Sequence, residues 1–439
     1  MFRFLSAVFI LATVPAAAQD IVPAELAGIA VLPAFSFSAP PADAPDEAWV
    51  SGRFTTGTVP VRAPMSVSAN GLMRPFFGQP LQGFSGYASQ RAPDGSLYAL
   101  IDNGFGSKVN SSDALLSFTR MTPDFGAGTI AVSERVWLHD PDQLAPFRIV
   151  HEATEARHLT GADFDPEAIQ IVGDTVWIGE EFGPFLISAT LDGRLTGVYP
   201  TMVEGKELRS PDHPALRIPA GAGDDWRLPR SGGFEGLALS PDRRTLWAML
   251  EKPLLDETGA SEGGFVRVLA FDTGAREWTG ENFRFALTPG AVAIGDFNFI
   301  DGTRALVIER DGGQGHPSAA CAPGETGDCF ANPARVKRVT LIDTAGTGEE
   351  GFVRRVAQID LLELRDTEGV ARNRETTGEL REGTFAFPFV TIESVIRDGE
   401  EHILVSNDNN LPFSAGRKPG VADDNEIIRL HVPELLSAE

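Results

Sequence analysis

Short apolar runs alternate with turn-forming residues along most of this chain, and the runs are rich in Val, Ile, Leu and aromatic residues. Runs of about five such residues are typical of β-strands. Asp-Gly and Pro-Asp pairs, which favour tight hairpin turns, separate many of the runs. One layout recurs: a polar residue, an apolar strand, a turn, a second strand and a closing group of acids or amides. Five such hairpins are predicted, at residues 85–103, 167–181, 235–252, 296–311 and 393–409.

A second hairpin follows most of these first ones. The predicted second hairpins lie at residues 114–138, 185–200, 264–287 and 335–361. Four-stranded sheets repeated around an axis make a β-propeller, so the sequence predicts an all-β fold, a β-propeller of five or six four-stranded blades. The segment 28–80 holds either a sixth blade or a strand that closes the ring by pairing with residues 427–430. A stacked solenoid is the alternative, although its repeats are normally shorter and more uniform.

Composition agrees with a turn-rich β fold and excludes several classes of partner. The 439 residues include 46 Gly and 31 Pro, a load that a helix bundle rarely carries. The formal net charge is −24, from 37 basic and 61 acidic residues. A surface this acidic repels phosphate backbones and anionic lipids, so we expect no nucleic-acid or membrane-surface partner. It suits metal cations instead.

The N-terminus has the pattern of a secretory signal. Arg3 precedes an uncharged, mostly apolar run from Phe4 to Val14, and Ala16–Ala18 offers small residues for cleavage. We therefore expect residues 1–18 to be a signal peptide and residues 19–439 to form a single domain, exported to the periplasm or secreted. The run is too short to span a bilayer, and no later segment reaches that length.

The two cysteines, Cys321 and Cys329, lie eight positions apart in a loop rich in Gly, Pro and Ala. In an oxidising compartment we expect them to form a structural disulfide. A zinc site is the alternative, but it lacks a nearby pair of histidines.

The repeat also predicts where acidic side chains gather. The first residue and the last residue of an antiparallel hairpin lie at the same end, so radial blades bring these residues around one axis. The predicted set joins the opening acids, the closing acids and the amides: Glu167, Glu235, Asp296 and Glu393; Asp102, Glu180, Glu181, Glu251, Glu309 and Asp408; Asn103, Asn407 and Asn409. Crowded carboxylates repel one another, and bound cations relieve the repulsion.

Hard oxygen ligands from carboxylates and amides favour Ca²⁺ over Zn²⁺. We therefore expect one or more Ca²⁺ ions on the axis. Two alternatives stay open: the acids are solvated strand ends, or the metal is purely structural. Asp163 and Asp165, shortly before Glu167, either add metal ligands or shape the loop.

Several longer motifs resemble a bacterial family described as having esterase-like activity of phytase. They include Asp102-Asn103-Gly104-Phe105-Gly106-Ser107-Lys108, Gly161-Ala162-Asp163-Phe164-Asp165, Gly179-Glu180-Glu181-Phe182-Gly183-Pro184, Gly233-Phe234-Glu235-Gly236-Leu237, Ile308-Glu309-Arg310-Asp311 and Asn407-Asp408-Asn409-Asn410-Leu411-Pro412. The resemblance runs from about residue 28 to the C-terminus. The family is similar to β-propeller phytases, which hold Ca²⁺ in a central acidic cleft and hydrolyse phosphomonoesters, and also to calcium-dependent propeller lactonases.

The resemblance implies an exported, metal-dependent hydrolase that acts on a small-molecule phosphomonoester or another ester, and we expect a monomer. The alternatives are a calcium-dependent lactonase or carboxylesterase-like propeller, and a non-enzymatic calcium-stabilised binding propeller. For phosphoester chemistry, Lys108 and Arg310, with Lys252 beside them, are candidates to hold phosphate, and His151 is the candidate general base. Each of the basic residues is alternatively a salt-bridge partner, and His151 is alternatively a structural histidine.

Serine-nucleophile chemistry is the other enzyme class considered. Residues 259–263 match G-x-S-x-G, with Ser261 at the centre. The motif has mechanical meaning only on a sharp strand-to-helix turn. Here it lies in a polar loop, so we interpret the match as a coincidence.

Overall fold

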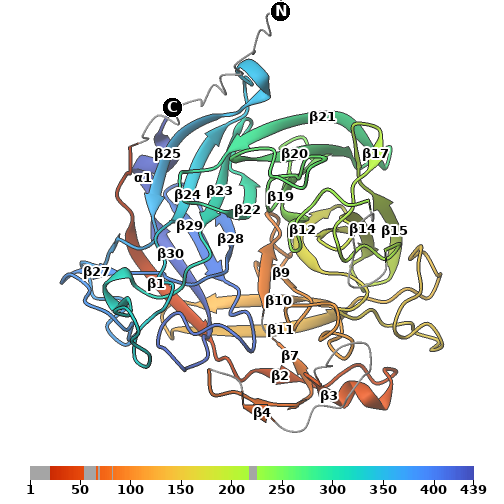
Figure 1. Ribbon diagram of the computed structural model, residues 1–439, viewed down its shortest axis with the longest axis horizontal. Helices are drawn as coiled ribbons and strands as arrows, with labels where there is room; N and C mark the ends of the chain where they lie inside the picture. The colour runs from red at the N-terminus through yellow and green to blue at the C-terminus, as the bar shows by residue number, and fades with distance from the viewer. Residues whose placement is uncertain (1–19, 54–65, 68–69, 82, 217–224) are drawn as a thin grey trace, which may run out of the picture.

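The computed structural model describes residues 20–53, 66–67, 70–81, 83–216 and 225–439, and almost all of its regular structure is β-strand (Figure 1). The all-β prediction is therefore confirmed. The helices in these ranges are one short α-helix, α1 (Pro433–Ser437), and three 3-10 turns, η1 (Asp46–Trp49), η2 (Pro317–Ala319) and η3 (Glu349–Gly351). None of them is long and apolar enough to cross a membrane. The predicted signal peptide lies outside the described residues.

Most strands belong to five antiparallel units of four strands, each in simple up-and-down order. In order from the innermost strand, the units are β8 (Phe84–Tyr87), β9 (Leu97–Ile101), β10 (Ser117–Asp124) and β11 (Thr129–Trp137); β12 (Pro166–Val172), β13 (Thr175–Glu180), β14 (Phe185–Thr190) and β15 (Leu195–Pro200); β18 (Phe234–Leu239), β19 (Thr245–Leu250), β20 (Phe265–Asp272) and β21 (Glu277–Ala286); β22 (Ala293–Phe299), β23 (Arg304–Arg310), β24 (Lys337–Asp343) and β25 (Arg354–Asp360); and β28 (Ile392–Arg397), β29 (His402–Asn407), β30 (Asn425–His431) and β1 (Glu25–Leu32).

The fifth unit joins the two ends of the chain. Strand β1 pairs antiparallel with β30, with Ile29 opposite Ile428, which is the closing pairing that the sequence set against a sixth blade. Strand β1 also meets β11 in parallel at Val31 and Thr129, so the first and fifth units form one larger sheet. This pairing of β1 with β30 combines strands from both ends of the chain in the last unit and closes the ring.

The other described strands before residue 81 form three short pairs rather than a four-stranded unit. They are β2 (Phe37–Ser38) with β7 (Gln79–Pro80), β3 (Val50–Ser51) with β6 (Phe76–Phe77), and β4 (Ser66–Val67) with β5 (Met73–Arg74).

The five innermost strands contact one another in the closed cyclic order β8, β12, β18, β22, β28 and back to β8. A strand between two neighbouring units is covered on both faces, which explains why β18, with the sequence FEGLAL, is buried at every position. Separate apolar clusters fill the spaces between units. One of them contains Phe118 of the first unit and Ile169 of the second.

Each innermost strand carries a β-bulge at the same place. The register shifts at the residue between Phe84 and Gly86, and at the equivalent place in the other four units. The bulged residues are Ser85, Glu167, Glu235, Gly295 and Glu393. This register corrects the sequence alignment of the fourth repeat: Gly295, not Asp296, is equivalent to the opening glutamates. Asp296 lies one position further along, with Gly236 and Ser394 as its equivalents.

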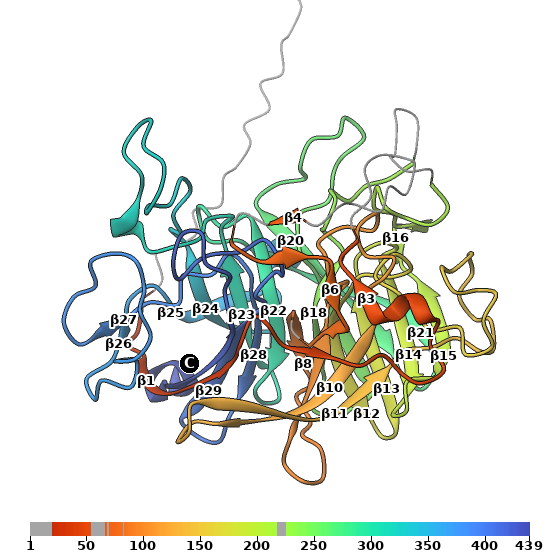
Figure 2. The same cartoon turned by 90° about the horizontal axis from the view of Figure 1, so that it is seen from below.

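The long connections leave the ring at one end, and the tight turns lie at the other (Figure 2). One long connection, between β23 and β24, contains the disulfide between Cys321 and Cys329, as predicted. The connection after β15 carries the small pair β16 (Met202–Val203) and β17 (Lys206–Glu207). The connection after β25 carries β26 (Leu364–Arg365) and β27 (Thr384–Phe385), which pair with each other.

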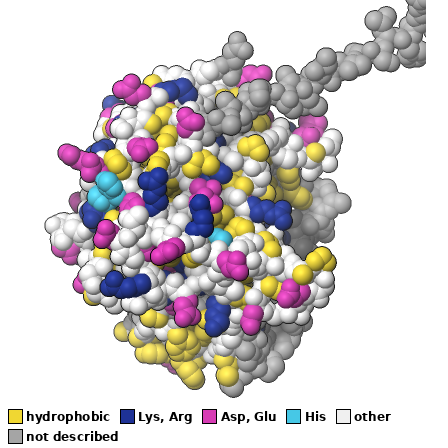
Figure 3. All heavy atoms as spheres, turned by 90° about the vertical axis from the view of Figure 1, so that its left-hand side faces the viewer, with side chains coloured by type: hydrophobic (Ala, Val, Ile, Leu, Met, Phe, Trp, Pro, Cys, Tyr) yellow, Lys and Arg dark blue, Asp and Glu magenta, His cyan; other side chains and the backbone are white. Residues whose placement is uncertain are grey.

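Acidic and basic side chains are interspersed on the outer face seen in Figure 3. The large excess of acid over base in the composition is therefore not gathered into one patch on that face.

Candidate metal centre

Two positions in every unit face the axis at the end of the ring with the long connections. One is the bulged residue of the innermost strand. The other position lies just after the second strand. In the first unit, Ile101 of β9 pairs with Phe84 at the start of β8, and the next residue, Asp102, occupies this closing position. The five closing residues are Asp102, Glu181, Glu251, Arg310 and Asp408. One fold repeat thus places seven acids, one arginine, Ser85 and Gly295 at ten equivalent positions.

With Asp165, from the loop before β12, these acids form what we call the axial acid cluster. Its members are Asp102, Asp165, Glu167, Glu181, Glu235, Glu251, Glu393 and Asp408. All but Asp102 are buried, and Asp102 is half-buried. Among the described residues, the basic side chains paired with cluster members are Arg310 and Lys252, so full ionisation of the cluster would leave an excess of six negative charges over these pairs. A buried excess of this size is costly unless protons or cations offset it.

Arg310 occupies the position that an acid holds in the other four units. Its Nη2 atom lies 3.2 Å from Glu235 Oε1, 2.7 Å from Glu251 Oε1 and 3.1 Å from Glu393 Oε1. Burial opposes the charge of the guanidinium, yet Glu251, Glu393 and Glu235 together raise the pKa of Arg310. Arg310 therefore stays charged and links these three glutamates of the cluster.

A second group of three cluster members has the arrangement best suited to a metal ion. One carboxylate oxygen from each of Asp165, Glu167 and Glu181 lies within 4.8 Å of the other two. Asp165 Oδ1 and Glu181 Oε1 are fully buried and make no hydrogen bond to any described residue. Burial raises the pKa of Glu167 and of Glu181 well above the usual range, and neighbouring carboxylates raise both further. This group is therefore the candidate among the described residues for holding a cation.

Asp102 and Asp408 form a third part of the cluster. Burial and then Asp165 raise the pKa of Asp102 to about 7, and burial and then Asp102 raise the pKa of Asp408. Both carboxylates lie close to Gly83, where a Cβ would be 2.6 Å from Asp102 Oδ1 and 3.5 Å from Asp408 Oδ1. The φ angle of Gly83 is +87°, which also favours glycine.

Four predicted ligands do not join the cluster, because successive residues of a strand point to opposite sides. Glu180, Glu309 and Asn407 each precede a closing residue, so they face between the units. Glu180 accepts hydrogen bonds from the backbone N–H groups of Phe182, Gly183 and Phe185, and Glu309 pairs with Arg355.

Asn407 and Asp296 serve the backbone in the same way. Asn407 Oδ1 accepts from the Glu426 backbone N–H. Asp296 accepts from the Val395 and Phe297 backbone N–H groups and from the Asn298 side chain, and burial raises its pKa to about 7.

The predicted ligand Asn103 lies beside Asp165 and supports it. Its side-chain oxygen accepts hydrogen bonds from the backbone N–H groups of Phe105 and Gly106. Burial raises the pKa of Asp165, and hydrogen bonding by Asn103 opposes that rise. Asp163 instead shapes the loop, because its carboxylate accepts from the backbone N–H groups of Val150 and Thr160. Of the two aspartates before Glu167, Asp165 therefore lies in the axial acid cluster and Asp163 does not.

The candidate phosphate-binding residues differ in their surroundings. Lys108 Nζ lies 5.1 Å from the centroid of the Phe182 ring and 3.2 Å from the Asp212 carbonyl oxygen, and Asp165 is among the carboxylates that act on it. Burial lowers the pKa of Lys108. Lys252 Nζ lies 2.6 Å from Glu251 Oε2. Both lysines border the cluster.

His151 lies away from the cluster. Burial is the main reason that its pKa is lowered, and the charged groups that act on it are His158 and Glu47 rather than any cluster member. The structure does not bring it together with the other candidate catalytic residues.

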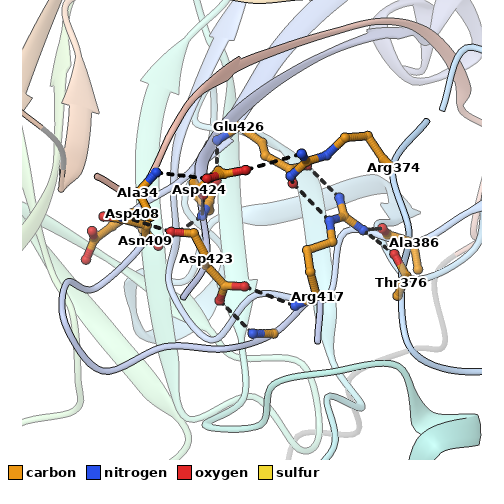
Figure 4. A network of polar contacts seen from close by, with 12 residues as sticks. Ala34, Arg374, Thr376, Ala386, Asp408, Asn409, Arg417, Asp423, Asp424 and Glu426 are labelled. Atoms are coloured by element: carbon orange, nitrogen blue, oxygen red, sulfur yellow. Dashed lines mark hydrogen bonds and ion pairs between the residues drawn. The ribbon is translucent and has the colours of Figure 1, made fainter. Parts of the chain in front are cut away.

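The loop that follows Asp408 is anchored by a buried network (Figure 4). The Arg417 guanidinium donates to Glu426 Oε1 at 3.0 Å and to Glu426 Oε2 at 2.6 Å, and lies over the rings of Phe385 and Phe389. Asp423 accepts from the Gly416 and Arg417 backbone N–H groups. This anchoring fixes the base of the loop, where Asp408 enters the cluster.

Asp165 is the cluster member that the hairpin repeat did not predict. It lies before the predicted strand, so the hairpin repeat gave it no position. The signal was its spacing two residues before Glu167, which places both side chains on one side of an extended chain. The Glu181 backbone N–H donates to the Asp165 carbonyl at 3.0 Å, which continues the β12–β13 hairpin to this residue.

Comparison with known proteins identifies the family. A family model for phytase-like proteins, described as esterase-like activity of phytase, matches residues 79–411. The chain belongs to this family, as its motifs predicted. A comparison with curated proteins gave no match.

Solved structures that resemble the chain do so at low similarity. They include the periplasmic gluconolactonase of Pseudomonas aeruginosa, with a TM-score of 0.32, 12% identity, and 88% of this chain and 99% of that chain covered. Another is the PQQ-bound aldose sugar dehydrogenase from Streptomyces coelicolor, with a TM-score of 0.33, 13% identity, and 80% and 95% covered.

Proposed function

We propose that this protein is an exported, metal-dependent hydrolase of ester bonds, with the axial acid cluster as its active site. The observation that carries the proposal is the buried group of Asp165, Glu167 and Glu181, whose oxygens converge while two of them lack a protein partner. Membership of a family described by esterase-like activity supports ester hydrolysis as the reaction class.

The residues present fit a hard divalent cation, and Ca²⁺ is the first choice. The donors are carboxylate oxygens, with no histidine or thiol among them, and such donors suit Ca²⁺ better than Zn²⁺. Asp165, Glu167 and Glu181 would hold the ion. When bound, such an ion supplies positive charge that polarises an ester oxygen and lowers the pKa of a coordinated water.

The two basic residues Arg310 and Lys108 have different roles in this proposal. Arg310 is committed to Glu235, Glu251 and Glu393, so its role in this proposal is to hold those glutamates rather than the substrate. Lys108 borders the cluster on the Asp165 side and is the better candidate to bind an anionic group of the substrate.

We also infer that the five four-stranded units are the blades of a five-bladed β-propeller. The cyclic contacts of the innermost strands and the pairing of β1 with β30 support this count. Export follows in this proposal from the signal-like residues 1–18 and agrees with the disulfide between Cys321 and Cys329.

The test is metal analysis of the purified mature protein followed by turnover of p-nitrophenyl phosphate and p-nitrophenyl acetate, with EDTA and after Ca²⁺ is restored. Turnover that EDTA abolishes and Ca²⁺ restores would support the proposal. Phosphate-ester turnover favours phytase-like chemistry, and carboxyl-ester or lactone turnover favours the lactonase-like alternative. Metal binding that raises the melting temperature without turnover of any ester would contradict catalysis and favour a calcium-stabilised binding protein.

A further inference from the structure

One cavity is lined by chain segments that lead into the axial acid cluster, and the proposed function gives it no role. It encloses about 480 Å³, and its described lining includes Asn70, Gln314, Phe330, Asn332, Asn410 and Phe413. The disulfide loop, the loop after Asp408 and the turn before β28 supply most of its wall. These three segments lead directly into the cluster, because Asn410 lies two residues from Asp408, Gly312 two from Arg310 and Val390 three from Glu393.

Hydrogen bonds tie this cavity firmly to the cluster. The Asn410 backbone N–H donates to Asp408 Oδ1 at 2.6 Å. On the opposite wall, Gln314 Oε1 accepts from the Ala415 backbone N–H at 3.1 Å, which joins the disulfide-loop side to the loop after Asp408. The cavity is therefore formed in advance rather than made by a ligand, as binding sites usually are.

The aromatic walls are also fixed. A Cβ at Gly315 would lie 2.2 Å from the Phe330 ring, so the ring packs flat against that glycine, whose φ angle is +86°. A Cβ at Gly106 would lie 3.1 Å from the Phe413 ring, which places Phe413 against the loop that follows Asp102. One aromatic wall thus touches the segment that carries a cluster carboxylate.

The chemistry of the lining differs from that of the cluster. None of the described lining residues is Asp, Glu, His, Lys or Arg. By contrast, another cavity, of about 450 Å³, has Asp360, Glu363, Arg365, Arg381 and Glu382 among its lining residues. An anion in this cavity would meet no opposite charge among the described lining residues and would lose hydration, which is unfavourable.

Amide groups supply polar contacts instead. Asn332 Nδ2 donates to the Gly312 carbonyl at 2.8 Å, and its Oδ1 makes no hydrogen bond in the described part of the chain. The Nε2 of Gln314 and the side chain of Asn410 likewise make none there. Amides donate and accept, so they match hydroxyl groups, and aromatic faces pack against the apolar faces of rings.

We propose that this cavity, which we call the uncharged subsite, binds an uncharged, hydroxyl-bearing ring that forms the non-reacting part of the substrate. A multiply phosphorylated compound is excluded as its occupant. The proposal rests on the proposed function for the statement that the bound ring belongs to a substrate. It goes beyond that function by naming the chemical class that the site selects.

The test uses a probe that an esterase does not cleave, p-nitrophenyl β-D-glucoside, with myo-inositol hexasulfate as a polyanionic comparison. Binding to the Ca²⁺-supplied, full mature chain is measured by saturation-transfer NMR and titration. Ala331→Trp places a large side chain at an exposed lining position. Ala322→Trp is the matched control, because Ala322 is an exposed alanine of the same disulfide loop and does not line the cavity.

We expect the glucoside to bind wild type and Ala322→Trp equally and to lose about tenfold or more in affinity with Ala331→Trp. Phe413→Ala, which removes a wall instead of filling the space, should also weaken it. Hexasulfate binding should not respond to Ala331→Trp. Glucoside affinity that is unchanged in Ala331→Trp, or hexasulfate affinity that falls with it, would overturn the proposal.

The same samples separate this proposal from the proposed function. Ca²⁺ affinity by calorimetry should be equal in wild type and all three variants, because none changes the cluster. If the protein binds no metal and turns over no ester while the glucoside pattern holds, the hydrolase proposal fails and the uncharged subsite stands. If turnover depends on metal while the glucoside does not bind at millimolar concentration, the subsite proposal fails alone.

Discussion

At the residue scale, the side chains around the axis differ in what already satisfies them. Arg310 Nη2 contacts Glu235, Glu251 and Glu393, whereas Asp165 and Glu181 each keep a buried oxygen without a partner. From the sequence alone, all the opening and closing acids were equivalent candidate metal ligands. The structure separates those already paired with a cation of the protein from those that lack one.

Glu181→Gln should weaken Ca²⁺ binding by about tenfold or more, because the variant replaces a charged ligand of the group with Asp165 and Glu167. Glu235→Gln and Glu393→Gln should weaken it less, since Arg310 already neutralises these glutamates. Calorimetric titration of the metal-free variants measures the order. Glu309→Gln is the control, because Glu309 pairs with Arg355 outside the cluster. A larger loss of Ca²⁺ affinity in Glu235→Gln than in Glu181→Gln would place the ion beside Arg310 and contradict this assignment.

Ser261→Ala should leave activity unchanged. The Ser261 hydroxyl is exposed and donates to the Gly263 carbonyl at 3.0 Å in a loop without a helix behind it. The measurement is kcat/KM on the p-nitrophenyl esters. An inactive variant with normal thermal unfolding would restore the serine mechanism.

At the element scale, a bulge in the innermost strand turns a glutamate onto the axis in three of the five units, at Glu167, Glu235 and Glu393. In β22 the bulged residue is Gly295, and a Cβ there would lie 1.9 Å from the Ile392 carbonyl oxygen of β28. No side chain fits where these two strands meet. The same contact lies next to Glu393, so the close approach also positions a member of the cluster.

Gly295→Ala should destabilise the fold by about 1–3 kcal/mol, because the methyl group forces β22 and β28 apart. Chemical denaturation measures the loss. Gly302→Ala is the matched control, since a Cβ at this turn glycine meets nothing within 4 Å. Equal stability of the two variants would show that the strands are not so closely packed.

At the scale of the whole molecule, the ring concentrates acids whose protonation is linked to folding. Burial raises the pKa of Asp102 to about 7 and of Asp165 to about 6, and Asp296 reaches about 7. The unfolded values of such groups are near 4, so the folded protein binds more protons between these limits. The stabilisation that this gives is full below about pH 4 and is lost as pH rises through about 6 to 7.

The metal-free protein should therefore unfold at a lower temperature near pH 8 than near pH 5, and Ca²⁺ should reverse the order because it replaces the protons. Calorimetric scans with EDTA and with Ca²⁺ test this. Asp102→Asn should flatten the pH dependence of the metal-free form. Stability that rises steadily from pH 5 to pH 8 in EDTA would contradict the buried, mutually repelling cluster.

Much of the fold was predictable because hairpins are local. The second hairpin predicted at 185–200, for example, has the bounds of β14 and β15 together, and 264–287 differs from β20 and β21 by one residue at each end. Turn residues and apolar runs of the right length lie next to each other in sequence, so they need no distant contact to be recognised. The family followed from motifs of the same local kind.

The sequence by itself determined the strands, the turns and the end of each hairpin at which acids gather, since all three depend on residues within about 20 positions. Only the tertiary structure decided which acids share the axis. A single residue of register exchanges the two sides of a strand, so Glu181 enters the cluster while Glu180 does not, and Gly295 replaces Asp296 at the bulge. Which residues of an innermost strand face the axis also depends on how that strand packs against the neighbouring units, and these contacts join residues far apart in the sequence.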